Sequence, residues 1–268
     1  MAGARNADGL AERLALARTL AVAVGHEIEI FREEAQFAFQ RKGLQDFVTA
    51  ADRKGEETIK SALAAAFPED GFLGEETGGA PDAHGFWVVD PIDGTTNYIR
   101  GLRHWCVSIA FVRAGEIELA CIYDATTGWV YSAARGGGAF CEEKSLAVSR
   151  REDPAEGLAI LGCSRRTSFE EYQAVQRRLH DLGVDYRRLG SAALGLVRVA
   201  SGVADLYYEA HVNSWDIMAG ALIAREAGAV VEMPSLDVML KRGGPLAAYA
   251  PSLGPQLRFL HELVRTTA

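Results

Sequence analysis

The segment that most constrains this chain is residues 90–97, which read DPIDGTTN. The apolar run FWVV comes directly before it and predicts a buried strand that ends at Asp90. Pro91 fixes its backbone φ angle and has no N–H to donate, which suits the exit from a strand, and Gly94 permits a tight turn. The Thr-Thr-Asn that follows is favoured at the start of a helix. A strand–turn–helix unit is therefore predicted, with the carboxylates of Asp90 and Asp93 on one rim.

This unit has the groups that a metal-assisted phosphate site needs. Asp90, Asp93 and the Ile92 carbonyl would offer the hard oxygen ligands that Mg²⁺ prefers. The helix start would offer backbone N–H groups to a phosphate. The motif alone leaves two other readings open. One is a plain turn, because Asp, Pro, Gly and Asn are turn formers. The other is a phosphatase of the haloacid-dehalogenase type, but its motif is D-x-D-G-T, whereas the spacing here is D-x-x-D.

Three further carboxylates lie at predicted element boundaries. Glu75 follows a short predicted strand at 72–74, although a Glu pair is usually a solvated surface feature. Asp52 ends the pattern TAAD, which predicts a helix start with Asp52 as a capping carboxylate. Asp216 lies in the first turn of a predicted helix, where the helix dipole favours an acid. Each has a structural explanation as well as a functional one.

Composition excludes several classes of protein. The chain has 268 residues, 28 Lys+Arg and 36 Asp+Glu, so its net charge of −8 argues against a general nucleic-acid binder. Its four cysteines are widely spaced, which predicts reduced thiols rather than a zinc site or a disulfide framework. No apolar run approaches the ~20 residues that span a bilayer, and charges interrupt the apolar N-terminal stretch, unlike a signal peptide. We expect a cytoplasmic protein with no membrane and no direct nucleic-acid partner.

The order of predicted elements divides the chain near residue 150. In the front half, 1–150, two helices precede strand-like runs with short turns, which predicts an α+β arrangement with an antiparallel meander. In the back half, 151–268, strands and helices alternate, which favours an α/β arrangement. No linker separates the halves, so we expect one layered body over 1–268. The predicted helices are 8–38, 49–67, 168–182, 191–201, 214–227 and 253–266, and the predicted strands are 72–74, 86–89, 105–112, 116–123, 128–133, 139–148, 158–163, 184–188, 203–208 and 229–232.

Several motifs occur together and in order. They are DFVTAAD at 46–52, GFLGEET at 71–77, DPIDGTTN at 90–97, GSAA at 190–193 and WDIMAGA at 215–221. This combination resembles the inositol monophosphatase family over nearly the whole chain. The resemblance implies a layered αβαβα fold, a homodimer, and a lithium-sensitive phosphomonoesterase with two or three Mg²⁺ ions per active site.

The resemblance also implies a role for each matched residue. Glu75, Asp90 and the Ile92 carbonyl would hold the first Mg²⁺, and Asp90, Asp93 and Asp216 the second. Asp52 and Thr95 would orient and deprotonate the attacking water, with Glu75 also counted as catalytic. The backbone N–H groups of Gly94 and Thr95 would hold the phosphate, and Ala192, Glu209 and Asp216 would face the rest of the substrate.

The resulting functional hypothesis is a phosphoric monoester hydrolase. We expect hydrolysis of inositol monophosphate, or of a similar small polyol phosphate, by in-line attack of metal-activated water. Histidinol phosphate and fructose 1,6-bisphosphate remain open as substrates on the same scaffold. A regulatory interaction protein of the extragenic-suppressor type is the alternative of another class. The sequence leaves open whether His211 faces the substrate and whether Lys42 supports the metal site.

Overall fold

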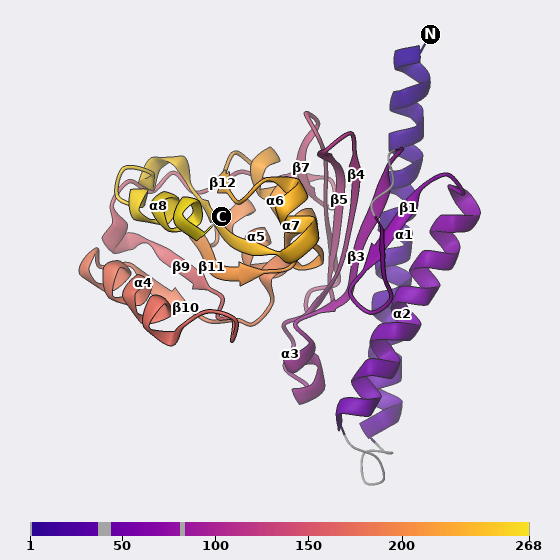
Figure 1. Cartoon of the computed structure of the whole chain (residues 1–268), viewed down its shortest axis with the longest axis horizontal. Helices are drawn as coiled ribbons and strands as arrows, with labels where there is room; N and C mark the ends of the chain where they lie inside the picture. Colours follow the sequence, from indigo (N-terminus) through magenta and orange to yellow (C-terminus); the bar gives the residue numbers. More distant parts are fainter. Residues whose placement is uncertain (1, 37–43, 81–83, 268) are drawn as a thin grey trace.

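The computed structural model describes residues 2–36, 44–80 and 84–267. Two long helices, α1 (Ala2–Gln36) and α2 (Leu44–Ala66), run side by side against one face of a large sheet (Figure 1). Buried apolar side chains such as Val24 of α1 and Ile59 of α2 pack on that face. The two predicted helices are confirmed, but α2 begins before Thr49. Lys42 lies outside the described residues.

The early start of α2 corrects the prediction for Asp52. Because α2 begins at Leu44, Asp52 lies inside the helix and does not cap it. The TAAD pattern is a local signal only, and the helix that begins five residues before it continues through it. Asp52 is 3% exposed, and an aspartate is seldom buried so completely unless it is paired.

The first sheet has eight strands in the order β2-β1-β3-β4-β5-β6-β7-β8. From β3 to β8 neighbouring strands are antiparallel, which confirms the predicted meander, whereas β1 pairs with β3 in parallel. The predicted strand 139–148 is wrong in extent, because a turn with Glu142 at φ 52° divides it into two short strands. The strands are β1 (Gly71–Gly74), β2 (Gly78–Ala80), β3 (Phe86–Asp93), β4 (Cys106–Arg113), β5 (Glu116–Asp124), β6 (Trp129–Ala134), β7 (Gly138–Cys141) and β8 (Lys144–Ser145).

The second sheet has five strands in the order β10-β9-β11-β13-β12. Its first three strands are parallel, as alternating strands and helices predict, but β13 runs antiparallel to both of its neighbours. The sequence patterns predicted neither β13 nor the short helix α7 before it. The strands are β9 (Leu158–Leu161), β10 (Asp185–Arg187), β11 (Leu206–Val212), β12 (Val230–Glu232) and β13 (Gly244–Tyr249), and the helices of this half are α4 (Phe169–Asp181), α5 (Ala192–Ala200), α6 (Ser214–Glu226), α7 (Leu236–Arg242) and α8 (Arg258–Thr267).

The elements stack as alternating layers of helices and sheets (Figure 1). Helices α5 and α6 lie between the two sheets, and the largest core cluster joins their side chains to both. Helices α4 and α8 cover the outer face of the second sheet. The predicted αβαβα layering is therefore confirmed. It leaves the ends of β3, α5 and α6 next to one another at the junction of the sheets.

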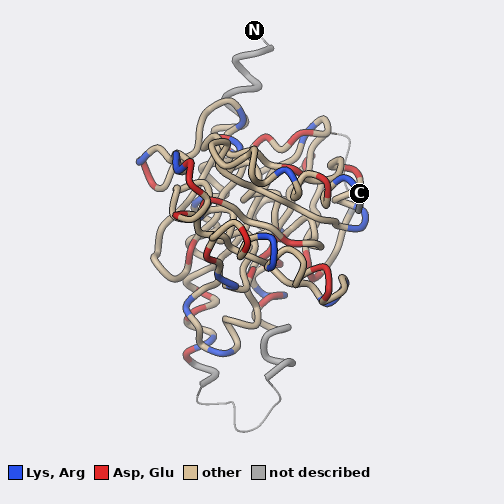
Figure 2. The backbone as a smooth tube through the Cα atoms, turned by 90° about the vertical axis from the view of Figure 1, so that its left-hand side faces the viewer, with Lys and Arg blue, Asp and Glu red and all other residues tan. Residues whose placement is uncertain are grey.

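Charged residues of both signs are interspersed along the chain in the view of Figure 2. No described helix is long and apolar enough to cross a bilayer.

Candidate active site

The DPID segment forms a bulge inside β3 and is not the exit from that strand. In the pairing with β4, Asp90 is opposite Ser108 and Asp93 is opposite Cys106, so two residues of β3 face one residue of β4. Pro91, which cannot donate to the ladder, lies in this bulge, where proline is tolerated. The prediction that the strand ends at Asp90 is thus wrong by three residues. The bulge lets both aspartates face the same region of the protein.

The structure brings all the predicted site carboxylates together around this bulge. Asp90 and Asp93 are 1% and 7% exposed. Glu75 lies just after β1, as predicted, and Asp216 lies in the first turn of α6. Burial raises the pKa of Asp90 well above its usual range, and the nearby charges raise it further. Those charges belong to Glu75, Asp93, Asp216 and Asp52.

Burial, followed for Asp52 and Glu75 by the charges of neighbouring carboxylates, raises the pKa of the other members too. The pKa of Asp52 rises to about 8, mainly because burial disfavours its charged form and then because Glu75 lies nearby. Burial of the carboxylate among protein atoms also raises the pKa of Glu75 to about 7, although the residue as a whole is exposed to solvent. The pKa of Asp93 rises to about 6, held down by the hydrogen bonds that it accepts. A compensating cation would favour the charged form of every carboxylate in this group.

The donor set fits a hard divalent cation. The cluster offers carboxylate oxygens, which suit Mg²⁺, and one buried oxygen, Asp52 Oδ1, has no hydrogen-bond partner in the structure. In the described ranges, no three His, Cys, Asp or Glu side chains already close around a single point. Metal binding would therefore have to turn some of these carboxylates. The residues present therefore have the oxygen ligands that Mg²⁺ requires, and binding of the ion would fix the orientation of their side chains.

Asp93 is anchored by the start of α5, about a hundred residues further along the chain. Its Oδ2 accepts hydrogen bonds from Ser191 Oγ at 2.6 Å and from the Ala193 N–H at 2.7 Å, and its Oδ1 accepts one from the Ala192 N–H at 3.3 Å. These are N-terminal groups of a helix, which favour a negative charge. Oδ1 therefore keeps most of its capacity for a further ligand, and Asp93 joins the carboxylate cluster to the start of α5.

Asp216 plays the capping role that its position suggested. Its Oδ2 accepts hydrogen bonds from the Asn213 backbone N–H at 2.7 Å and from Asn213 Nδ2 at 3.2 Å. Both interpretations of Asp216 are thus compatible, since one oxygen caps α6 and burial and Asp93 raise the pKa of the carboxyl. Arg166 Nη1 in turn donates to Asn213 Oδ1 at 2.7 Å and contacts His211 Nε2 at 2.8 Å. His211 is thus engaged by Arg166 and is not among the residues that line the neighbouring pocket.

The predicted phosphate-binding turn is the start of α3 (Thr95–Arg100). Gly94 caps it with φ 100°, a left-handed conformation, and a Cβ there would lie 2.9 Å from the His104 carbonyl oxygen. Thr95 Oγ1 donates to the Ile92 carbonyl oxygen at 3.0 Å. The first N–H groups of a helix lack intrahelical acceptors, so this turn offers donors to an anion next to the carboxylates.

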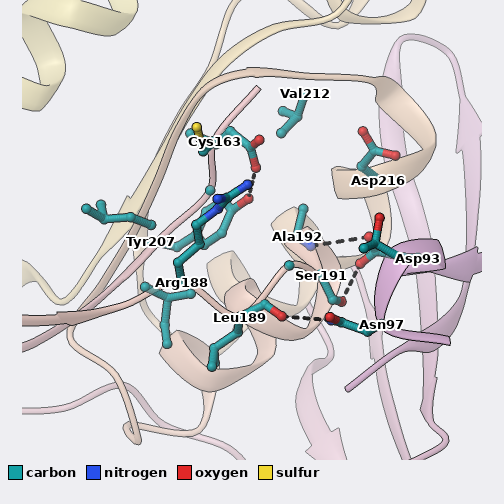
Figure 3. Close-up of a pocket in the computed structure, with 16 residues that line it drawn as sticks. Asp93, Asn97, Cys163, Arg188, Leu189, Ser191, Ala192, Tyr207, Val212 and Asp216 are labelled. Atoms are coloured by element: carbon teal, nitrogen blue, oxygen red, sulfur yellow. Dashed lines mark hydrogen bonds between the residues drawn. The ribbon is translucent and has the colours of Figure 1, made fainter. Parts of the chain in front are cut away.

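A pocket of about 480 Å³ adjoins the carboxylates (Figure 3). Asp93 and Asp216 line it together with the predicted substrate contacts Ala192 and Glu209. Glu209 Oε2 accepts a hydrogen bond from Tyr207 Oη at 2.6 Å. The structure therefore places the predicted substrate-facing residues in one cavity that opens onto the carboxylates.

Sequence reasoning missed the residue that holds the turn carrying Glu75. Glu56 of α2 is fully buried, and its two oxygens accept hydrogen bonds from the Glu76 and Thr77 N–H groups, both at 2.8 Å. Gly74 allows this approach, because a Cβ there would collide with the Glu56 carboxylate. The available signal was the spacing of Glu56 from Asp52, since residues four apart share one helix face.

A Glu56→Gln variant is expected to need about tenfold more Mg²⁺ for half-maximal phosphatase activity, the usual scale for losing a group that supports a metal ligand. The amide NH₂ would face one of the two backbone N–H donors, so the turn with Glu75 would shift. The Mg²⁺-induced rise in melting temperature should weaken in parallel. Glu57→Gln, on the exposed face of the same helix, is the matched control. Equal Mg²⁺ requirements for the two variants would contradict this role of Glu56.

Comparisons with known proteins identify the family of the chain. Residues 10–263 match the model of the inositol monophosphatase family. The chain is 40% identical over 194 residues to the Nus factor SuhB of Xylella fastidiosa, covering 71% of this chain and 70% of that protein. It is 39% identical over 203 residues to the inositol-1-monophosphatase of Rhizobium meliloti, covering 74% and 76%. The solved structure of Mycobacterium tuberculosis SuhB aligns with a TM-score of 0.79 and 33% identity, covering 94% of this chain and 98% of that one. The chain therefore belongs to the inositol monophosphatase family of phosphatases.

Proposed function

We propose that this protein is a Mg²⁺-dependent phosphomonoesterase that hydrolyses inositol monophosphate or a similar small polyol phosphate. The observation that carries the proposal is the convergence of five carboxylates next to a pocket of about 480 Å³. Four of them are buried or partly buried, and such a cluster is stable only with a cation or with bound protons. The relatives named inositol-1-monophosphatase support the reaction class.

In this proposal the metal-holding groups are Glu75, Asp90, the Ile92 carbonyl, Asp93 and Asp216. Bound Mg²⁺ would acidify a water molecule and offset the charge of the phosphoryl oxygens. The N–H groups of Gly94 and Thr95 would hold the phosphate at the start of α3.

Asp52 and Thr95 are proposed to handle the attacking water. Asp52 has one oxygen without a hydrogen-bond partner, and burial and nearby carboxylates raise its pKa to about 8. Once a cation compensates the neighbouring charge, the ionised form of Asp52 is favoured and can take up a proton from the water. The Thr95 hydroxyl donates a hydrogen bond to the Ile92 carbonyl oxygen. The lone pairs of the hydroxyl oxygen stay available to accept a hydrogen bond from water. No nucleophilic side chain is needed, and a trapped covalent phosphoprotein would contradict direct attack by water.

Phosphate release tests this function. We expect release from inositol 1-phosphate in the presence of Mg²⁺ and none when the metal is chelated. Histidinol phosphate and fructose 1,6-bisphosphate, measured in parallel, rank the two alternative substrates by kcat/KM. Absence of release from all three esters at saturating Mg²⁺ would contradict the enzymatic proposal.

A second candidate function is a binding role of the kind that the name Nus factor SuhB gives to the Xylella fastidiosa relative. The identity of 40% with that protein is the observation in its favour. An inactive but folded protein in the phosphate-release assay would favour this candidate. The homodimer, the cytoplasmic location and the lack of direct nucleic-acid binding stay predictions from the sequence.

A further inference from the structure

The pocket beside the carboxylates has two chemically different ends. Asp93 and Asp216 line the end next to the bulge in β3. Arg188 lines it away from these aspartates, on the side of Cys163 and Tyr207 (Figure 3). A phosphate ester bound with its phosphate at the carboxylate end would extend its alcohol part toward Arg188. The alcohol part therefore meets a cation, and the charge of that part matters.

The acidic residue at this end of the pocket is already engaged. Glu209 is wedged between Tyr207, whose hydroxyl donates to it at 2.6 Å, and Gly162, where a Cβ would collide with the carboxylate. Burial raises the pKa of Glu209 to about 7, against the opposing effects of the Tyr207 hydrogen bond and of the nearby Arg188 charge. It therefore offers only a weak counter-charge to a substrate.

Arg188 is less constrained, although its charge acts on Glu209 and lowers the pKa of that carboxyl. Its side chain is exposed, and among the described residues it makes no hydrogen bond and no ion pair within 4.0 Å. Its neighbour Arg187 behaves differently, since it donates to the Tyr186 carbonyl at 2.8 Å and pairs with Asp185 at 2.7 Å. Arg188 is thus a basic residue of the described pocket lining whose guanidinium donors stay available.

The backbone beneath Arg188 is fixed relative to the carboxylates. Asn97 of α3 donates to the Leu189 carbonyl at 2.7 Å, and Ser191 donates to Asp93 at 2.6 Å. Gly190, between them, has φ 81° and makes the turn possible. The guanidinium is therefore attached at a defined place relative to the phosphate end, although its own side chain is not held.

We propose that Arg188 selects substrates by the charge of their alcohol part. It favours esters that carry a second anionic group there and disfavours those that carry an ammonium group. The proposal rests on the phosphatase function above and sharpens its substrate class. A guanidinium binds a carboxylate or a second phosphate through paired hydrogen bonds and repels a cation. Cationic amino-alcohol phosphates, which include histidinol phosphate, are then poor substrates.

Three esters that differ only at the far end of a six-carbon chain test this proposal. They are 6-phosphogluconate with a carboxylate, glucitol 6-phosphate with a hydroxymethyl group, and 1-amino-1-deoxyglucitol 6-phosphate with an ammonium group. We expect kcat/KM to fall in that order. The carboxylate should exceed the ammonium ester by on the order of 100-fold, about tenfold each for the attraction gained and the repulsion avoided.

In Arg188→Gln this ratio should fall to within about threefold, because both charge contacts are lost. Arg188→Lys keeps the charge without the paired donors and should retain an intermediate ratio, and Arg187→Gln is the matched control that should retain the parent ratio. A parent ratio near one, an unchanged ratio in Arg188→Gln, or an equal effect of Arg187→Gln would overturn the proposal. If the parent hydrolyses none of the three esters, phosphate release from inositol 1-phosphate decides whether the phosphatase function itself fails. The dissociation constants of the three six-carbon esters, measured by calorimetry with Mg²⁺, then test the role of Arg188. The same order of affinity supports that role, and equal values overturn it.

Discussion

An Asp90→Asn variant is expected to lose phosphatase activity by about 10³-fold and yet to melt at a higher temperature than the parent when metal is absent. The loss follows from removing one fixed charge from the centre of the site, which is worth about that factor in enzymes. The gain follows from the surroundings of Asp90, which is 1% exposed and faces other carboxylates. Asparagine keeps an oxygen to accept the Ile92 N–H, as Asp90 Oδ1 does at 2.9 Å, so the bulge should persist.

Asp124→Asn is the matched control, because this aspartate is equally buried but paired. Asp124 is 0% exposed, and Arg198 Nη2 donates to its Oδ2 at 2.8 Å. Breaking a buried ion pair on one side destabilises by about 3–5 kcal/mol, so the melting temperature should fall in this variant. Phosphate release at saturating Mg²⁺ and thermal melting in a chelator give both readouts. Substantial activity in Asp90→Asn, or a fall in its melting temperature like that of Asp124→Asn, would contradict the cation-site assignment.

Asp93→Asn is a less clean test of the same idea. The Asp93 carboxylate accepts hydrogen bonds from Ser191, Ala192 and Ala193 and so holds the start of α5. An asparagine NH₂ would face some of these donors, and the variant would lose stability as well as activity.

The metal-free protein is expected to lose stability as the pH rises from about 5 to about 8, the reverse of the usual behaviour of paired carboxylates. The native pKa values are raised to about 6 for Asp93, about 7 for Glu75 and about 8 for Asp52, while unfolded carboxyls titrate near 4. Between these limits the native state holds more protons than the unfolded state, so the free energy of unfolding falls as pH rises. The stabilisation is complete below the unfolded values and is lost above about pH 8.

Thermal melting in a chelator across this range should show a fall of about 5 °C, and saturating Mg²⁺ should raise the melting temperature more at pH 8 than at pH 5. The reason is that the cation replaces bound protons, and fewer protons are bound at pH 8. Asp90→Asn should flatten the pH dependence. A metal-free protein whose melting temperature rises from pH 5 to pH 8, or an equal Mg²⁺ effect at both pH values, would contradict the raised pKa values.

Local sequence patterns predicted the kinds of element well where one strong signal covered the whole element. The apolar run FWVV gave the core of β3, and the alternation of polar and apolar segments gave α4 and β9. Boundaries failed where a local motif competed with a longer preference, as at Thr49 in α2. The strand β13 was missed because its sequence, GPLAAY, begins with Gly-Pro and has a weak strand pattern, and pairing on both sides makes it a strand.

The ordered motifs also predicted the family and the candidate metal ligands. What no motif showed was how the ligands are supported. Glu56 contacts a turn twenty residues away, and Ser191 contacts Asp93 from the other half of the chain. Such hydrogen bonds depend on the packing of separate layers, which leaves no periodic signal in the sequence.

By itself the sequence determined the chemistry that is available: carboxylates at defined places in DPID, GEE and WD, next to a turn that can bind a phosphate. Only the tertiary structure decided that these groups share one cavity, that Glu209 is engaged by Tyr207, and that Arg188 faces the same space with its donors free. The physical reason is that residue type sets which charges and hydrogen bonds a side chain can make. The distance between side chains, and the solvent removed from around them, exist only after the layers have packed.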